Sequence, residues 1–533
     1  MLSNPVPTSV SATRLVVLWS RHAIWLALLL ASVLAWHSTR HAAEDSIKAD
    51  GRQNLTIAFN LAERGEFSGS KRTEAAKPSN FREPLPIWVV AAYLKAFALP
   101  VQPVLTADDL FKGPNAAHIK RHNAGWVFLG FLGCWLLFHA LTGSHLGALL
   151  SSLVIHVLLL DLPYLVNTLY TELAASVLLI WCTWLLVRAF DSQQRRYWLL
   201  AGVLFGLLAL TKGIFLYAAI ASLPFIVLAQ LYRRDELRGR VLRALQAVAL
   251  VAAGLAVTVA PWMARNWVYF GSLQITEGRG GWVLYKRHLL NNMTPEEYKG
   301  GFFYYGPGIF RELVAGTSWA ISAEDVGKVG GKVSRLHIGG SEFKDSDFVA
   351  QRTGQPDMAV TYYRKASAKA RELQKHYASL GHPQPAIQAD HDMQAIGMAG
   401  IRQELGSHLK VTVLMAWRGF WSFPPRMFLP FEPDRALAQR TLEWLNLVSG
   451  LALYAVFLSG LLLRKPRWLL FAVPAMSMLA LYALLTQSMA RFTVPANPLM
   501  LMALFVLLHA AWHRWAPRSR PATANGTLEA TPA

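Results

Sequence analysis

The sequence predicts an all-α protein that crosses a membrane many times. Three observations predict this fold: 53% of the 533 residues are hydrophobic, the apolar residues gather in long runs, and basic residues gather between the runs. A helix needs about 20 apolar residues to cross the roughly 30 Å hydrocarbon layer of a bilayer. Several runs are short, so we expect about 10 to 13 membrane helices. The runs are residues 15–36, 123–142, 145–160, 163–188, 197–212, 213–231, 241–263, 440–463, 467–486 and 492–513.

The distribution of the formal charge of +20 predicts the orientation of these helices. If the amino terminus is cytoplasmic, many basic residues fall in short cytoplasmic loops, as the positive-inside rule requires. They are Arg188, Arg195, Arg196, Arg233, Arg234, Arg238, Arg240, Arg243, Arg464, Lys465, Arg467, Arg514, Arg518 and Arg520. We therefore interpret the basic excess as an orientation signal and a contact with anionic lipid. No zinc-finger spacing or nucleic-acid module accompanies it, so no nucleic-acid partner is expected.

The orientation divides the chain into five parts. We expect a disordered cytoplasmic segment at 1–14, a transmembrane module at 15–263, an outer lobe at 264–439, carboxy-terminal membrane helices at 440–515 and a cytoplasmic tail at 516–533. The transmembrane module includes a first outer loop at 37–122, and the outer lobe includes a polar stretch at 320–400.

Four helices are predicted outside the membrane spans. The first outer loop contains a helix from Asn54 to Arg64 and an apolar helix at 85–99 that is too short to span easily. Trp88 and Tyr93 in the second of these suit a membrane interface. The outer lobe contains a helix at 362–380 and an interfacial helix at 408–421.

The two cysteines, Cys134 and Cys182, both fall within apolar runs. A disulfide framework or a cysteine metal site needs thiols that are placed together outside the membrane. We therefore expect neither.

Acidic residues gather in the first outer loop, directly after the first apolar run. Asp50 is followed by a helical stretch and a Gly65-x-Phe67-Ser68 group, and then by the run Phe81-Arg82-Glu83-Pro84-Leu85-Pro86. This order resembles the first outer loop of bacterial polytopic glycosyltransferases of the C-type superfamily, whose relatives include protein O-mannosyltransferases and the lipid A aminoarabinose transferase. The chain departs from the family pattern at Asn54, where the family has a tyrosine.

Further matches follow in order along most of the chain. They are Leu162-Pro163 with Thr171-Glu172, Gly202 to Thr211-Lys212, Pro261-Trp262 with Arg265-Asn266 and Phe270-Gly271, and Ala490-Arg491-Phe492 with Pro495 and Pro498. Each motif alone is weak, but the ordered set is fairly specific. The polar stretch at 320–400 has no counterpart.

The resemblance implies an enzyme of the bacterial inner membrane with a periplasmic active site. Its donor would be a sugar on a polyprenyl phosphate, and inversion at the anomeric carbon is expected. Its acceptor would be an envelope glycolipid, a glycan or a protein, and the sequence does not choose among them. The transmembrane module at 15–263 would then be the catalytic module.

Asp50 is the predicted general base, since a positioned carboxylate can take the proton of an attacking hydroxyl. Glu44 and Asp45 are competing candidates in the same loop. The alternative reading of Asp50 is a loop acid or a cap for the following helix. Glu83 is predicted as a second catalytic acid that orients the acceptor or binds a metal; alternatively, it is only a first-turn acid of the next helix.

Four cations are predicted to bind the donor phosphate: Arg82, Lys212, Arg265 and Arg491. Arginine and lysine stabilise the charge of a leaving phosphate where water is partly excluded. The alternative is that these side chains only snorkel to the interface. Glu172 would lie about 13 Å inside the span 163–188, at 1.5 Å per residue. An acid in a membrane is a functional candidate, although a hydrogen bond to a neighbouring helix explains it equally well.

No cofactor is certain from the sequence. A divalent metal is a candidate because His288 and His408 share the predicted outer side with Glu83, but the histidines show no convincing ligand spacing.

Two rival function classes remain open. A transporter or lipid flippase would carry ionisable residues along mid-membrane spans, broken helices and often internal repeats, and the sequence shows no repeat. A polysaccharide polymerase or ligase would share the lipid-linked donor, but would place its signature in the large late outer loop. The acids after the first run favour the glycosyltransferase.

Overall fold

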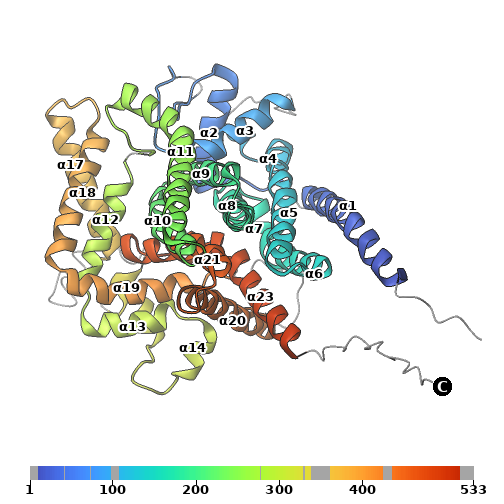
Figure 1. The fold of residues 1–533 in the computed structure, drawn as a ribbon. Helices are drawn as coiled ribbons and strands as arrows, with labels where there is room; N and C mark the ends of the chain where they lie inside the picture. Colours follow the sequence, from blue (N-terminus) through green and yellow to red (C-terminus); the bar gives the residue numbers. More distant parts are fainter. Residues whose placement is uncertain are drawn as a thin grey trace, which may run out of the picture.

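The computed structural model is all-α, as predicted (Figure 1). It describes residues 10–40, 42–71, 74–97, 107–276, 278–327, 331–337, 360–423 and 435–515. Within these residues the only extended pairing is an isolated β-bridge between Ser68 and Pro78.

The first half of the chain supplies a helical bundle and two helices that lie against it. In chain order these elements are α1 (Val10–Arg40), α2 (Ala49–Arg64), α3 (Pro84–Ala96), η1 (Ala107–Leu110), α4 (Gly113–Lys120), α5 (Asn123–Thr142), α6 (His145–Ile155), η2 (His156–Leu160), α7 (Pro163–Val166), α8 (Glu172–Ser192), α9 (Arg195–Ala209), α10 (Ile214–Leu231) and α11 (Leu237–Phe270).

The second half forms a lobe and then returns to the bundle. The lobe contains α12 (Gly280–Leu289), η3 (Leu290–Asn292), α13 (Pro295–Tyr305), α14 (Gly308–Leu313), α15 (Ala323–Gly327), η4 (Ser334–Leu336), α17 (Tyr362–Ser379), α18 (Pro385–Gln403) and α19 (Leu405–Phe420). The return consists of α20 (Arg435–Leu462), α21 (Pro466–Leu485), α22 (Ala490–Thr493), η8 (Val494–Ala496) and α23 (Asn497–Trp515).

Eight helices of the described residues are long and apolar enough to cross a membrane by length and composition. They lie at His22–Arg40, Gly113–Thr142, Glu172–Ser192, Ile214–Leu231, Leu237–Phe270, Leu437–Leu462, Pro466–Leu485 and Ala490–Trp515. Two of the predicted runs form shorter helices: 145–160 becomes α6 with η2, and 197–212 becomes α9. The protein is therefore a multi-pass membrane protein.

The predicted span at 163–188 is broken, which corrects the position of Glu172. Helix α7 ends at Val166, and α8 begins only at Glu172. The side chain of Asn123 on α5 donates to the carbonyl groups of Val166 and Thr168, at 2.9 Å each, and these contacts hold the connecting segment out of helical geometry. Glu172 thus lies at the end of a helix and not about 13 Å inside one.

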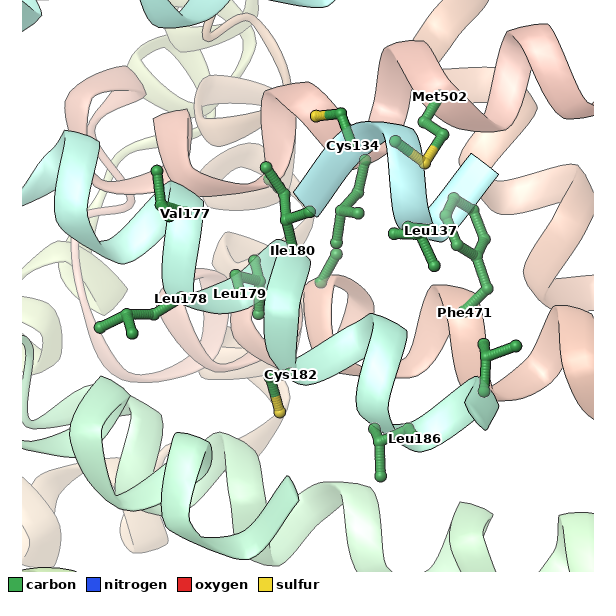
Figure 2. Close-up of a cluster of buried hydrophobic side chains, with 14 of the residues drawn as sticks. Cys134, Leu137, Val177, Leu178, Leu179, Ile180, Cys182, Leu186, Phe471 and Met502 are labelled. Atoms are coloured by element: carbon green, nitrogen blue, oxygen red, sulfur yellow. The ribbon is translucent and has the colours of Figure 1, made fainter. Parts of the chain in front are cut away.

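Helix α8 is the most enclosed of the eight candidate spans. Its residues Val177 to Leu186 pack against α5, α21 and α23, as Figure 2 shows around Phe471 and Met502. Cys134 on α5 and Cys182 on α8 are buried within this core, inside two of the predicted apolar runs, and both are free.

The segment between α1 and α4 folds onto the bundle. Helix α2 begins five residues before the predicted Asn54, and the Asn54 amide donates to the carbonyl group of Leu169 at 2.8 Å. The Leu85 N–H at the start of α3 donates to the carbonyl group of Leu210 at 3.0 Å, just beyond α9. Both helices are therefore fixed to the connections next to α8 and α9.

The lobe is held by buried polar contacts. Helices α12, α17 and α18 pack side by side, at the left of Figure 1. The Asp390 carboxylate of α18 accepts from the N–H groups of Gly281 and Trp282 at 3.0 and 2.9 Å, which caps α12. Arg335 forms a buried ion pair with Glu297. The Asp390 contacts fix the start of α12 against α18.

The helices predicted for the lobe are present with shifted ends. Helix α17 covers the predicted 362–380, and α19 covers most of the predicted 408–421. Of the predicted disordered segment 1–14, residues 10–14 are the start of α1 and the rest lie outside the described residues. Residues 516–533 and two parts of the polar stretch, at 328–330 and 338–359, also lie outside the described residues.

We predict that Gly202→Ala destabilises the bundle. A methyl group at Gly202 on α9 would lie 2.1 Å from the carbonyl oxygen of Val251 on α11, so the two backbones would have to separate. Overpacking of this kind costs about 1–3 kcal/mol. Thermal unfolding of the purified protein measures the loss. Gly125→Ala on α5, where a methyl group meets nothing within 4 Å, is the control and should unfold no earlier than the wild type.

Candidate functional site

Six charged side chains from separate parts of the chain converge beside the start of α2. We call them the charged cluster: Asp50, Arg82, Glu172, Lys212, Arg279 and Arg491. They come from the first turn of α2, the residue pair before α3, the start of α8, the connection just after α9, the residue before α12, and α22. Five of the six are among the seven residues predicted from the sequence.

Asp50 is the centre of three arginine contacts. Its Oδ1 atom accepts from Arg82 Nη2, and Arg279 Nη2 lies 3.8 Å from the same oxygen. Its Oδ2 atom lies 3.2 Å from Arg491 Nη2. The Asp50 side chain keeps 30% of its surface exposed, so a reactant can still reach it.

The arginines change the acidity of Asp50. Burial alone would raise the pKa of this carboxyl group, because a charge is less stable away from water. The hydrogen bond and charge of Arg82 outweigh burial, with help from Arg491 and Arg279, and hold the pKa of Asp50 below its ordinary value. Asp50 is therefore ionised at neutral pH.

Local backbone geometry positions Asp50. Lys48 is the N-cap residue of α2 and makes no side-chain capping bond. Ala49 has φ 48°, a left-handed conformation that costs a non-glycine residue on the order of 1–3 kcal/mol. An acid in the first turn of a helix gains from the helix dipole, so the capping alternative explains part of the position. It does not explain the three arginines.

Arg82 is buried and held from two sides. Its Nε atom donates to Gln53 Oε1 at 2.9 Å, and its Nη2 atom contacts both Gln53 and Asp50. Gln53 follows Asp50 by three residues on α2, so the two acceptors share one face of the helix. Gln53 was not predicted as a site residue.

Glu172 joins the deep end of the charged cluster. Its Oε1 atom accepts from Lys212 Nζ at 3.1 Å and from Arg491 Nε at 2.8 Å. Its side chain is only 2% exposed. Arg491 also lies over the ring of Tyr170, with its Cζ atom 4.0 Å from the ring centroid. Glu172 therefore positions Lys212 and Arg491 and is too enclosed to meet a substrate directly.

Two predicted residues lie apart from these contacts. Arg265 donates to the carbonyl group of Ser79 at 3.0 Å and lies 4.5 Å from the centroid of the Trp262 ring. Within the described residues it has no ion pair with Asp50, and its contacts hold the loop before α3. Glu83 is the N-cap residue of α3 and makes no side-chain capping bond. Burial lowers the pKa of the Arg279 guanidinium, and the negative charge of Glu83 partly offsets this.

The competing acids of the first loop have structural partners. The Asp45 carboxylate pairs with Lys120, whose Nζ atom also donates to the carbonyl groups of Ala43 and Asp45 at 2.8 and 2.9 Å. The Glu44 carbonyl group accepts from the Gly113 N–H at 2.8 Å. These contacts tie the loop to α4 and leave Asp50 as the loop acid that faces arginines.

Arg279 is the member of the charged cluster that sequence reasoning missed. It precedes α12, inside the run Gly278-Arg279-Gly280-Gly281-Trp282. An arginine among glycines, in a segment with no membrane span to orient, is the signal in the sequence from which it could be found.

The structure brings two of the predicted metal ligands into neighbouring positions, since Arg287, next to His288, donates to the carbonyl oxygen of His408 at 2.9 Å; within the described residues no such contact reaches Glu83. His288 Nδ1 lies 3.8 Å from Glu404 Oε2, and His408 is buried on α19. Among the residues that the structure describes, no group of three histidine, cysteine, aspartate or glutamate side chains could hold a metal ion.

Residues 113–262 match the sequence profile of a family described as dolichyl-phosphate-mannose-protein mannosyltransferase. This match confirms the predicted resemblance to C-type membrane glycosyltransferases for that part of the chain, which includes Glu172 and Lys212. No curated protein matches the sequence.

A comparison with solved structures finds similarity to two proteins that are described here. One is the archaeal oligosaccharyltransferase AglB from Archaeoglobus fulgidus, in complex with an inhibitory peptide and a dolichol-phosphate: 12% identity, TM-score 0.46, covering 93% of this chain and 51% of that chain. The other is ArnT from Cupriavidus metallidurans bound to undecaprenyl phosphate: 13% identity, TM-score 0.34, covering 92% of this chain and 78% of that chain. The chain thus spans about half the length of the archaeal enzyme.

We predict that Glu172→Gln destabilises the protein by roughly 3–5 kcal/mol, because it leaves Lys212 and Arg491 together without their shared counter-charge. Thermal unfolding of the purified variant measures this loss. Glu83→Gln is the matched control and should stay within about 0.5 kcal/mol of the wild type. A Glu172→Gln variant as stable as the control would contradict the anchoring role of Glu172.

Proposed function

We propose that the protein is a C-type membrane glycosyltransferase that moves a sugar from a polyprenyl-phosphate donor to an acceptor hydroxyl group. The observation that carries the proposal is the partly exposed Asp50 carboxylate facing Arg82, Arg279 and Arg491. The family match at 113–262 supports the same reaction class.

The proposed step needs one base and one site for negative charge. The acceptor oxygen attacks the anomeric carbon, and the bond from that carbon to the phosphate oxygen breaks. The hydroxyl proton passes to Asp50, and the bonding electrons leave with the polyprenyl phosphate. Attack opposite the leaving group inverts the anomeric carbon. The arginines stabilise the charge that develops on the departing phosphate.

Asp50 suits the role of base better than the other acids do. Glu172 is 2% exposed and shared between two cations, and Asp45 is paired with Lys120. Glu83 forms no ion pair within the described residues, whereas Asp50 has ion pairs with three arginines. We assign Glu83 the role of orienting the acceptor.

Donor binding would prepare Asp50 for catalysis. While all three arginines contact its carboxylate, Asp50 is a weak base, because their positive charges lower its pKa. A donor phosphate competes for Arg279 and Arg491, whose Nη2 atoms are 3.8 and 3.2 Å from the carboxylate. As these contacts pass to the phosphate, the pKa of Asp50 rises and the carboxylate becomes a better proton acceptor. Lys212 holds Arg491 in place through Glu172.

The proposed location is the bacterial inner membrane with the charged cluster on the periplasmic side. The loop between α1 and α4 and the lobe between α11 and α20 both contribute to the charged cluster, so they share one side. The arginine-rich connections between α8 and α9 and between α10 and α11 would then be cytoplasmic, together with both termini. Candidate acceptors are a glycolipid, a glycan or a protein of the envelope.

We predict that Asp50→Asn lowers transfer by about 10²–10⁴-fold, the usual contribution of a general base. Sugar transfer from a radiolabelled polyprenyl-phosphate donor in membranes measures it, after immunoblotting confirms normal abundance. Glu44→Gln removes an exposed carboxylate from the same loop; it is the control and should keep near-normal transfer. Full activity of Asp50→Asn would refute the assignment.

A second prediction concerns the pH profile. Since Arg82 lowers the pKa of Asp50, Arg82→Gln should raise that pKa and move the acidic limb of kcat/KM to higher pH. The wild type should stay active further into the acidic range, because its base is protonated only below its ordinary pKa. Arg52→Gln is the control, since Arg52 lies on the same helix with its Cζ atom 4.4 Å from the centroid of the Phe111 ring. An acidic limb that Arg82→Gln leaves in place would count against Asp50 as the titrating group.

A further inference from the structure

Gln53 is an exposed, neutral side chain that takes most of the hydrogen bonds of the buried Arg82. Its Oε1 atom accepts from Arg82 Nε at 2.9 Å and also from Arg82 Nη2. Within the described residues, Asp50 accepts from Arg82 through Nη2 alone. The edge of a guanidinium that carries Nε and Nη2 is one with which arginine binds a carboxylate by two parallel hydrogen bonds. Here that edge is turned to an amide oxygen, although a carboxylate lies beside it.

The contact with Gln53 limits Arg82 to one oxygen of Asp50. Arg82 donates to Oδ1, and Arg279 Nη2 lies 3.8 Å from the same oxygen. The other oxygen, Oδ2, lies 3.2 Å from Arg491 Nη2. An Arg82 that bound Asp50 with both donors would cover both oxygens, one with each N–H group. Gln53 therefore keeps Arg82 away from Oδ2.

The three arginines differ in how open they are to a ligand. The side chain of Arg82 is 6% exposed, whereas those of Arg279 and Arg491 are 44% and 36% exposed. A donor phosphate can reach Arg279 and Arg491, while Arg82 stays enclosed between Gln53 and Asp50. When Arg491 Nη2 turns to the phosphate, Oδ2 loses its cation and Oδ1 keeps Arg82. The oxygen without a cation is then the better proton acceptor, because a nearby positive charge favours the ionised carboxylate.

We propose that Gln53 is a positioning residue, which holds Arg82 on Oδ1 so that Oδ2 is the atom of Asp50 that accepts the proton of the attacking hydroxyl group. This inference rests on the proposed function and assigns its proton transfer to one atom. The proton moves to Oδ2 as the acceptor oxygen bonds to the anomeric carbon and the bond to the phosphate oxygen breaks. A glutamine suits this position because it accepts from Arg82 without a negative charge of its own.

Two substitutions of Gln53 should move the acidic limb of kcat/KM in opposite directions. Gln53→Leu removes the competing acceptor, so Arg82 turns both donors to Asp50 and the pKa of Asp50 falls further below its ordinary value. The acidic limb then moves to lower pH by about one unit. The kcat at neutral pH falls by about tenfold, the usual effect of one hydrogen bond to a charged group.

Gln53→Glu has the same size but adds a carboxylate beside Asp50. The new carboxylate competes for Arg82 and repels the charge of Asp50, so the pKa of Asp50 rises. The acidic limb then moves to higher pH by about one unit. The other charged groups that face Asp50 are Arg279 and Arg491, and both are unchanged in the two variants. Sugar transfer from the radiolabelled donor, followed over a range of pH values, measures both shifts.

Gln403→Glu is the matched control for the added charge. Gln403 is exposed on α18, and its side chain forms no hydrogen bond within the described residues. This variant should keep the wild-type acidic limb and kcat. A merely structural role of Gln53 would lower the thermal stability of its variants and leave the limb in place. A limb that stays in place in either Gln53 variant, or that moves the same way in both, would overturn the proposal.

The Asp50→Asn variant separates the failure of this inference from the failure of the proposed function. If Asp50→Asn keeps full transfer, the base assignment fails and the role of Gln53 fails with it. If Asp50→Asn is inactive while either Gln53 variant keeps the wild-type limb, the role of Gln53 alone fails.

Discussion

The rest of the site depends on Arg491, which joins two carboxylates. Its Nε atom donates to Glu172 at 2.8 Å and its Nη2 atom lies 3.2 Å from Asp50. One guanidinium can do this because its donors are spread over a rigid plane, whereas a lysine is a single point of charge. Through Arg491, the enclosed α8 of the core is connected to the accessible first turn of α2.

The lobe takes part in the site and is not an appendage. Asp390 of α18 caps α12 at Gly281 and Trp282, and the residue just before that helix is Arg279, which faces Asp50. The polar helices of the lobe thus set the position of one arginine of the charged cluster. Helix α18 begins within the polar stretch at 320–400, which has no counterpart in the family pattern. Its packing against α12 gives that stretch a physical role.

Hydropathy predicted the all-α fold, the long spans and the buried cysteines, because those features depend on runs of neighbouring residues. The break before α8 escaped prediction, since it depends on Asn123 reaching carbonyl groups more than forty residues away. Asp50, Arg82, Lys212, Arg491 and Glu172 were predicted as site residues, but their pairing was not. Arg279 carries only the weak signal of an arginine among glycines, since its importance comes from the carboxylate that it faces.

Ala49 and Ser488 have φ values of 48° and 41°, and they stand next to Asp50 and three residues before Arg491. The two segments that contain these residues meet in the Asp50–Arg491 ion pair. The contacts of each segment therefore help to hold the strained turn of the other segment. A ribosome makes the α2 end first and the α22 end among the last helices. The charged cluster is therefore completed only when the final hairpin of helices arrives, late in synthesis and membrane insertion.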